Sequence, residues 1–186
     1  MSRPWKNKFL PFVALAVLFL AGCGGDQRAY WEKADPPIPA PDFQAPLLSG
    51  GQTRLADYRG KIVVMEFWAT WCGVCRQTMP SLEKIHRRYQ DRDVQFLLVN
   101  LGEEPEKVKK FLKSKYQTPV VLDSTQMIAR RYNVTGIPAL FIIDGQGKLR
   151  FAKNGYNGGL EKELPKALDA LIAERTAQPP QEATNG

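Results

Sequence analysis

The sequence predicts an α/β fold in which helices cover both faces of a central sheet. Two apolar runs, KIVVMEFWA at 61–69 and VQFLLVN at 94–100, have the composition of strands buried on both faces. Each run is followed by a segment whose apolar residues recur at helical spacing. A hairpin and an amphipathic helix close the chain, so strands and helices alternate as this fold class requires.

The first predicted elements lie on either side of the two paired cysteines in the sequence. FQAPLLSGGQTRLADYRG at 43–60 predicts a short hairpin that turns at Ser49-Gly50-Gly51. After the strand at 61–69, a helix should begin near Cys72, and Pro80 inside it should bend it. The apolar face of this helix carries Met79, Leu82, Ile85 and Tyr89.

The second half alternates in the same way after the strand at 94–100. EEPEKVKKFLKSKY at 103–116 predicts a helix with acids at its start and lysines at its end, which complements the helix dipole. A short strand at 118–123, a short helix at 126–132 and a hairpin with a Gly-rich turn at 138–155 follow. The apolar face of the last helix carries Leu164, Leu168, Leu171 and Ile172.

The N-terminus has the pattern of a targeting signal. Three basic residues precede FLPFVALAVLFLAG at 9–22, which is shorter than the about 20 residues of a membrane-spanning helix and suits a secretory signal. The run ends in LAGC, which resembles the bacterial lipobox, where the peptide is cut before the cysteine and lipid is attached to its sulfur. We therefore predict a signal peptide at 1–22 and a lipidated Cys23, which also explains the odd cysteine. The alternative is an uncleaved anchor helix with an incidental cysteine.

Charge and composition limit the partners and the domain boundaries. Loss of residues 1–22 lowers Lys+Arg from 26 to 23 against 19 Asp+Glu, so the net charge falls from +7 to +4. The remaining chain has no long basic run interleaved with aromatic residues, which argues against nucleic-acid binding. We predict a Pro/Gly-rich tether at 23–40, one folded domain at 41–174 and a disordered tail at 175–186.

Cys72 and Cys75 form a C-x-x-C pair at the junction of a strand and a helix. Unpaired N–H groups and the dipole at a helix start stabilise a thiolate, so Cys72 is the expected nucleophile and Cys75 the resolving thiol. A structural zinc site wants four ligands, and the only histidine, His86, lies on the same helix. A purely structural disulfide is the other alternative, but its short loop adds little stability. The pattern favours a redox-active Cys72–Cys75 disulfide without a metal.

The motifs VVMEFWATWCGVC and VTGIPALFIID resemble those of thioredoxin-fold proteins. Over residues 41–172 the order of elements is similar to that of the TlpA/ResA branch of membrane-tethered, extracytoplasmic thiol-disulfide oxidoreductases. The resemblance implies a central mixed sheet flanked by helices, with an N-terminal β-hairpin and an inserted helix. It also implies a cis peptide bond between Ile137 and Pro138, which would bar metal from the thiols and leave the preceding backbone free to pair with substrate.

The resemblance also implies a set of residues that contact substrate. These are Trp71, Gly73, Val74, Ile137 and Pro138. Residues between the cysteines tune the thiol pKa and the reduction potential, and the absence of histidine there favours a reductant. Glu103 and Glu104 open the inserted helix near the region where relatives recognise partners, although solvated residues at a helix start are the more ordinary interpretation.

Glu66 interrupts an apolar strand six residues before Cys72, the position of the buried acid in thioredoxins. Burial should keep its carboxyl protonated with a raised pKa. Members of the ResA type tend to carry their acid three residues after the second cysteine, where this chain has Thr78. Our hypothesis is that Glu66 transfers a proton for Cys75; the alternative is a partly exposed glutamate at a strand end.

The resemblance implies a lipid-anchored thiol-disulfide oxidoreductase on the extracytoplasmic side of a bacterial membrane. Its substrates would be disulfides in exported proteins, including apocytochrome c, and its electrons would come from a membrane thiol reductant. No organic cofactor is required. Two alternatives stay open: a general disulfide reductase or oxidant unrelated to cytochromes, and a tethered Cu(I)-binding chaperone that uses the cysteines and a methionine. Met65 and Met79 are spaced like core residues, which counts against the chaperone.

Overall fold

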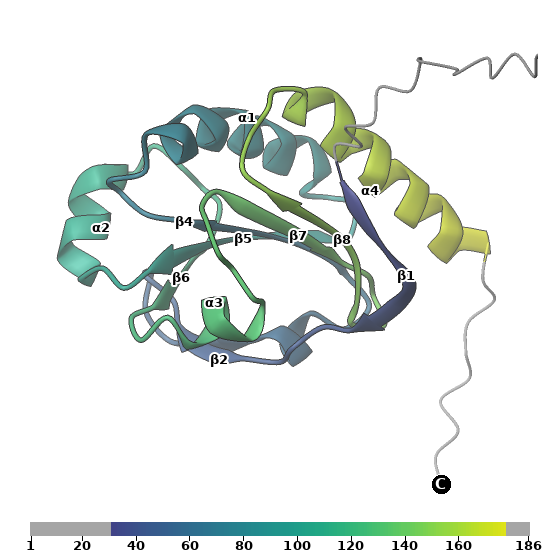
Figure 1. Ribbon diagram of the computed structural model, residues 1–186, viewed down its shortest axis with the longest axis horizontal. Coiled ribbons are helices and arrows are strands. Elements are labelled where there is room, and N and C mark those ends of the chain that lie inside the picture. Colours follow the sequence, from purple (N-terminus) through teal and green to yellow (C-terminus); the bar gives the residue numbers. More distant parts are fainter. Residues whose placement is uncertain (1–30, 178–186) are drawn as a thin grey trace, which may run out of the picture.

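A six-stranded sheet forms the centre of the molecule (Figure 1), with the strand order β1-β8-β7-β4-β5-β6. The neighbours β4, β5 and β6 are parallel, whereas β7, β8 and β1 each pair antiparallel with their neighbours. The strands are β1 (Glu32–Pro39), β4 (Ile62–Trp68), β5 (Val94–Leu101), β6 (Val120–Asp123), β7 (Ala139–Ile143) and β8 (Lys148–Asn154). The predicted hairpin is present as a separate small sheet of β2 (Gln44–Pro46) and β3 (Gln52–Arg54), followed by a 3₁₀ turn at Leu55–Tyr58.

Helices cover both faces of the central sheet, which confirms the predicted fold class. In Figure 1, α1 (Gly73–Tyr89) and α4 (Leu160–Ala177) lie over one face, while α3 (Met127–Arg131) and the β2–β3 hairpin lie over the other. The inserted helix α2 (Pro105–Leu112) connects β5 to β6.

This computed structural model describes residues 31–177. The predicted signal peptide at 1–22 and the lipidation of Cys23 lie outside the described residues. Among the residues described, no helix combines the length and the apolar character that crossing a bilayer requires.

The alternating side chains of β4 divide the core into two clusters. Val64 and Trp68 point into the cluster beneath α1 and α4, whereas Met65 and Phe67 point into the cluster beneath α3 and the hairpin. Every residue of β4 is buried, as the apolar run predicted. Glu66 therefore faces α1, because residues two apart share a face of a strand.

The tether predicted at 23–40 is wrong for residues 32–39. These residues form β1, which pairs with β8 at the edge of the sheet, and Glu32 lies opposite Ala152. The register breaks between Lys33 and Ile38, around prolines that cannot donate to a ladder and are tolerated at a sheet edge. β1 thus covers an edge of β8 that would otherwise be open.

Two other boundaries differ from the prediction. The inserted helix ends at Leu112 instead of 116, because Lys113 and Ser114 adopt left-handed backbone angles, with φ of 46° and 57°. The last helix extends to Ala177, so residues 175–177 belong to the folded domain and not to the predicted tail. The remainder of that tail lies outside the described residues.

Candidate active site

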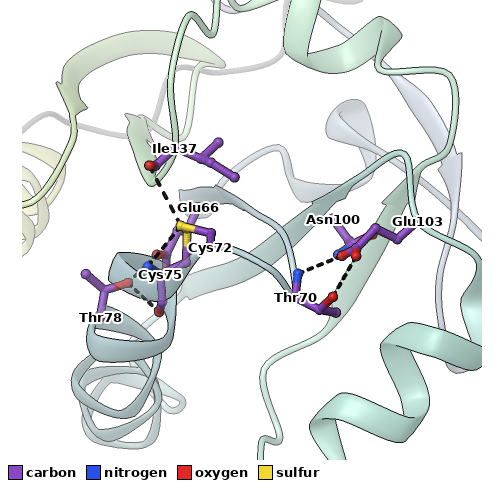
Figure 2. The surroundings of a disulfide bond; sticks show 8 residues. All are labelled: Glu66, Thr70, Cys72, Cys75, Thr78, Asn100, Glu103 and Ile137. Atoms are coloured by element: carbon purple, nitrogen blue, oxygen red, sulfur yellow. Dashed lines mark hydrogen bonds between the residues drawn. A yellow bond between two sulfur atoms is a disulfide. The ribbon is translucent and has the colours of Figure 1, made fainter.

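The paired cysteines lie where the chain leaves β4 and enters α1 (Figure 2). Cys72 caps the helix, and its Sγ accepts a hydrogen bond from the backbone N–H of Cys75 at 3.1 Å. The two sulfurs form a disulfide, so this is the oxidised state of the pair. Cys72 is 6% exposed and Cys75 is 0% exposed. The more exposed of the two cysteines is therefore the one at the helix start, where N–H groups favour a thiolate.

The rim of the site combines exposed apolar side chains with a backbone acceptor. Trp71 is 67% exposed, and Gly73 and Val74 beside it are also exposed. The carbonyl oxygen of Ile137 lies 3.8 Å from Cys72 Sγ, and the Ile137–Pro138 peptide bond is cis, as the resemblance implied.

Glu66 lies behind the disulfide and is 0% exposed, so the alternative of a partly exposed glutamate is wrong. Its Oε1 accepts a hydrogen bond of 2.5 Å from the Thr78 hydroxyl, which also contacts the carbonyl of Cys75 at 2.9 Å (Figure 2). Its Oε2 has no partner among the described residues. Burial raises the pKa of Glu66 to about 7, although the Thr78 hydrogen bond acts in the opposite direction. The carboxyl can therefore take or release a proton near neutral pH.

A second buried carboxyl, Glu103, fixes the loop that precedes the cysteines. It accepts hydrogen bonds from the Thr70 backbone N–H at 2.7 Å, the Thr70 hydroxyl at 2.6 Å and the Asn100 amide at 2.9 Å. Lys107 Nζ adds an ion pair at 2.7 Å. Burial raises the pKa of Glu103, but these donors outweigh it and lower the pKa to about 2. Glu103 is therefore an anion that holds the active-site loop.

Sequence reasoning treated Glu103 as a solvated residue, and this is wrong: it is 7% exposed. Glu104, its neighbour, is exposed at the start of α2 as expected. The sequence signal that could have revealed this was Asn100, a polar residue at the end of a largely apolar strand, because a buried polar side chain needs a hydrogen-bond partner.

The structure brings Glu66, Ile137 and Pro138 together around the disulfide. Trp68 is fully buried in the core, as predicted. Met79 packs in the same cluster as the cysteines, whereas Met65 belongs to the cluster on the other face of the sheet. Within residues 31–177, no group of three His, Cys, Asp or Glu side chains is placed to hold a metal ion.

Comparisons with known proteins agree with this geometry. The chain is 40% identical over 112 residues to the thiol-disulfide oxidoreductase ResA of Geobacillus thermodenitrificans, covering 60% of this chain and 64% of that protein. It is 39% identical over 134 residues to ResA of Geobacillus kaustophilus, covering 71% and 75%. The crystal structure of a Chlorobium tepidum protein, assigned as thiol:disulfide interchange protein DsbE, aligns with a TM-score of 0.69 at 31% identity, covering 76% of this chain and 98% of that one.

These similarities confirm the thioredoxin-like fold and the resemblance to ResA-type proteins, and they identify the chain as a thiol-disulfide oxidoreductase. The AhpC/TSA family matches residues 38–152, which is more than half of the chain. The chain therefore belongs to the AhpC/TSA family.

Proposed function

We propose that this protein reduces disulfides in exported proteins, including apocytochrome c, on the extracytoplasmic side of a bacterial membrane. The observation that carries the proposal is the arrangement around the helix start: Cys72 is slightly exposed (6%), Cys75 is fully buried, and the Glu66 carboxyl behind them has a pKa of about 7. The names of the ResA and DsbE relatives support thiol-disulfide exchange as the reaction. Lipid attached to Cys23 would hold the domain at the membrane.

The exchange starts from the reduced pair. The Cys72 thiolate attacks one sulfur of the substrate disulfide; that disulfide breaks, a mixed disulfide forms, and the other substrate sulfur leaves as a thiolate that takes up a proton. The exposed Trp71 and the carbonyl of Ile137 flank this step, where an extended substrate segment can pack and pair.

Cys75 then resolves the mixed disulfide. Its thiol loses a proton, and the thiolate attacks Cys72 Sγ, so that the second substrate sulfur leaves and the Cys72–Cys75 disulfide closes. Glu66 is the proposed acceptor of that proton, because its carboxyl approaches α1 through Thr78, whose hydroxyl also contacts the Cys75 carbonyl. One electron pair passes to the substrate, and a membrane thiol reductant restores the dithiol.

Trapping in cells tests this proposal. A Cys75→Ser variant forms the mixed disulfide through Cys72 but cannot resolve it, so it should accumulate covalent complexes with exported proteins that dissolve on reduction. The matched control is the double variant Cys72→Ser/Cys75→Ser, which should trap nothing. Capture of apocytochrome c supports the full proposal, and capture of other exported proteins alone supports a general reductase. If neither variant traps a partner under any growth condition, the proposal is wrong.

A further inference from the structure

A hollow with cationic walls lies beside the active-site loop. It has a volume of about 440 Å³, and we call it the basic hollow. Its lining residues are Thr70, Lys107, Lys110, Phe111, Lys113 and Lys115. None of these lining residues is acidic; Glu103, which is not among them, pairs with Lys107. We infer that the basic hollow binds acidic residues that flank the disulfide of a protein substrate.

The charge of the basic hollow is largely uncompensated. Lys107 Nζ is 2.7 Å from the Glu103 carboxylate, which neutralises that one cation. The exposed side chains of Lys110, Lys113 and Lys115 form no ion pair with any residue between 31 and 177. A concave surface with charges of one sign concentrates the field and attracts ligands of the opposite sign.

The left-handed turn that ends α2 allows lysines from the helix and from the segment after it to line the basic hollow together. Lys113 and Ser114 are both left-handed, with φ of 46° and 57°, and this turn ends the helix at Leu112. Glycine is the residue that fits such positions without strain, yet this chain has lysine at the first of them. As a result, Lys113 and Lys115 line the same hollow as the helical Lys107 and Lys110.

The basic hollow is tied to the reactive cysteine. Thr70 forms part of its wall and lies two residues before Cys72 in the chain. Glu103 holds Thr70 through both its backbone N–H and its hydroxyl (Figure 2). A polypeptide whose disulfide reaches Cys72 therefore has the basic hollow within reach of its neighbouring residues. The ring of Phe111, which packs on Trp68 with centroids 5.6 Å apart, adds an apolar contact that suits a peptide better than a lipid headgroup.

The test uses the full protein and rests on the proposed function. Two synthetic peptides carry the same intramolecular disulfide, flanked by Asp and Glu in one and by Asn and Gln in the other. At low salt the unmodified protein should reduce the acidic peptide about tenfold faster than the amide peptide. The preference should vanish near 1 M salt, where the screening length falls to about 3 Å.

Lys110→Glu/Lys113→Glu should reverse this preference. The matched control is Lys61→Glu/Lys148→Glu, which makes the same change of charge with exposed lysines at the other end of the sheet, and it should keep the preference. Lys110→Gln/Lys113→Gln, which avoids new like charges, should remove the preference without reversing it. All variants should reduce the uncharged disulfide of 2-mercaptoethanol at the same rate, which shows that the site is intact.

Three results would overturn the inference. Equal rates for the two peptides at low salt would show that the basic hollow does not contact substrate. An equal loss of preference in both charge-reversal variants would show that only net charge matters. If Lys110→Glu/Lys113→Glu lost binding to phosphatidylglycerol vesicles but kept its peptide preference, the surface would face a membrane. Failure of the unmodified protein to reduce the uncharged disulfide would instead contradict the proposed function, and the inference with it.

Discussion

Glu66 and Glu103 are the same residue type, both are buried beside the active-site loop, and their pKa values differ in opposite directions from that of an ordinary glutamate. Glu66 lies inside β4 and has a pKa of about 7, whereas Glu103 follows β5 and has a pKa of about 2. Burial raises both values, so burial alone does not explain the difference.

The number of donors explains it. Glu66 accepts one hydrogen bond, from Thr78, and its second oxygen has no partner among the described residues. Glu103 accepts hydrogen bonds from the Thr70 backbone and hydroxyl and from Asn100, and it pairs with Lys107. Donors favour the charged form of a carboxyl, and desolvation favours the neutral form. One carboxyl is therefore suited to exchange a proton, and the other to hold a loop in place.

Substitution by glutamine should separate the two roles most clearly in stability. At pH 7, Glu103→Gln should lower the free energy of unfolding by about 3 to 5 kcal/mol, because an amide cannot accept from all these donors or pair with Lys107. Glu66→Gln should raise it by up to about 3 kcal/mol, because the amide stays neutral on unfolding whereas the Glu66 carboxyl loses its proton. Urea unfolding of the oxidised protein measures both, and equal losses would contradict the comparison.

The pH dependence of stability should show the same contrast. The folded pKa of Glu66 lies above the ordinary 4.5, so the folded state keeps a proton that the unfolded state loses, and stability falls as pH rises from about 4.5 to 7. The folded pKa of Glu103 is depressed, so its stabilisation is present above about 4.5 and is lost as pH falls towards 2. Plotted against pH, the free energy of unfolding should therefore fall on both sides of about pH 4.5, along a neutral limb due to Glu66 and an acid limb due to Glu103. The change along each limb should be about 3 kcal/mol.

The glutamine variants identify which group is responsible for each limb. Glu66→Gln should flatten the fall above pH 4.5, and Glu103→Gln should reduce the fall below it. Glu83, whose pKa is also lowered against the effect of burial by hydrogen bonds from 117–118 and Arg87, should retain part of the acid limb. An unchanged neutral limb in Glu66→Gln would show that this carboxyl does not titrate as proposed.

The smallest predicted effects concern the reaction rate. Glu66→Gln should slow disulfide exchange at pH 7 by about tenfold without unfolding the protein, because Cys75 loses its proton acceptor. Thr78→Val should slow disulfide exchange less than Glu66→Gln does. It should also shift the pH–rate profile towards higher pH, since the Thr78 hydrogen bond lowers the pKa of Glu66. Stopped-flow reduction of a peptide disulfide measures both rates. An unchanged rate and profile in Glu66→Gln would remove this glutamate from the mechanism.

Features that depend on neighbouring residues in the chain could be predicted from the sequence, whereas features that depend on residues far apart in the chain could not. The cysteine pair at a strand–helix junction and the acidic residue inside β4 are local patterns, and both were predicted. β1 was missed because its prolines resemble a tether until β8, more than a hundred residues later, offers an edge to pair with. Glu103 was missed because Thr70, its main partner, lies 33 residues earlier in the chain.

The sequence by itself determined the chemistry that is available: two thiols one helical turn apart, a carboxyl buried among apolar residues and a cluster of lysines after the second strand. Only the tertiary structure decided which carboxyl has a pKa near neutral and which stays charged, because the pKa of a buried acid depends on donors that distant segments bring to it. It also decided which lysines line the basic hollow, since two left-handed residues end α2 and Lys113 and Lys115 join the helical Lys107 and Lys110 in its lining.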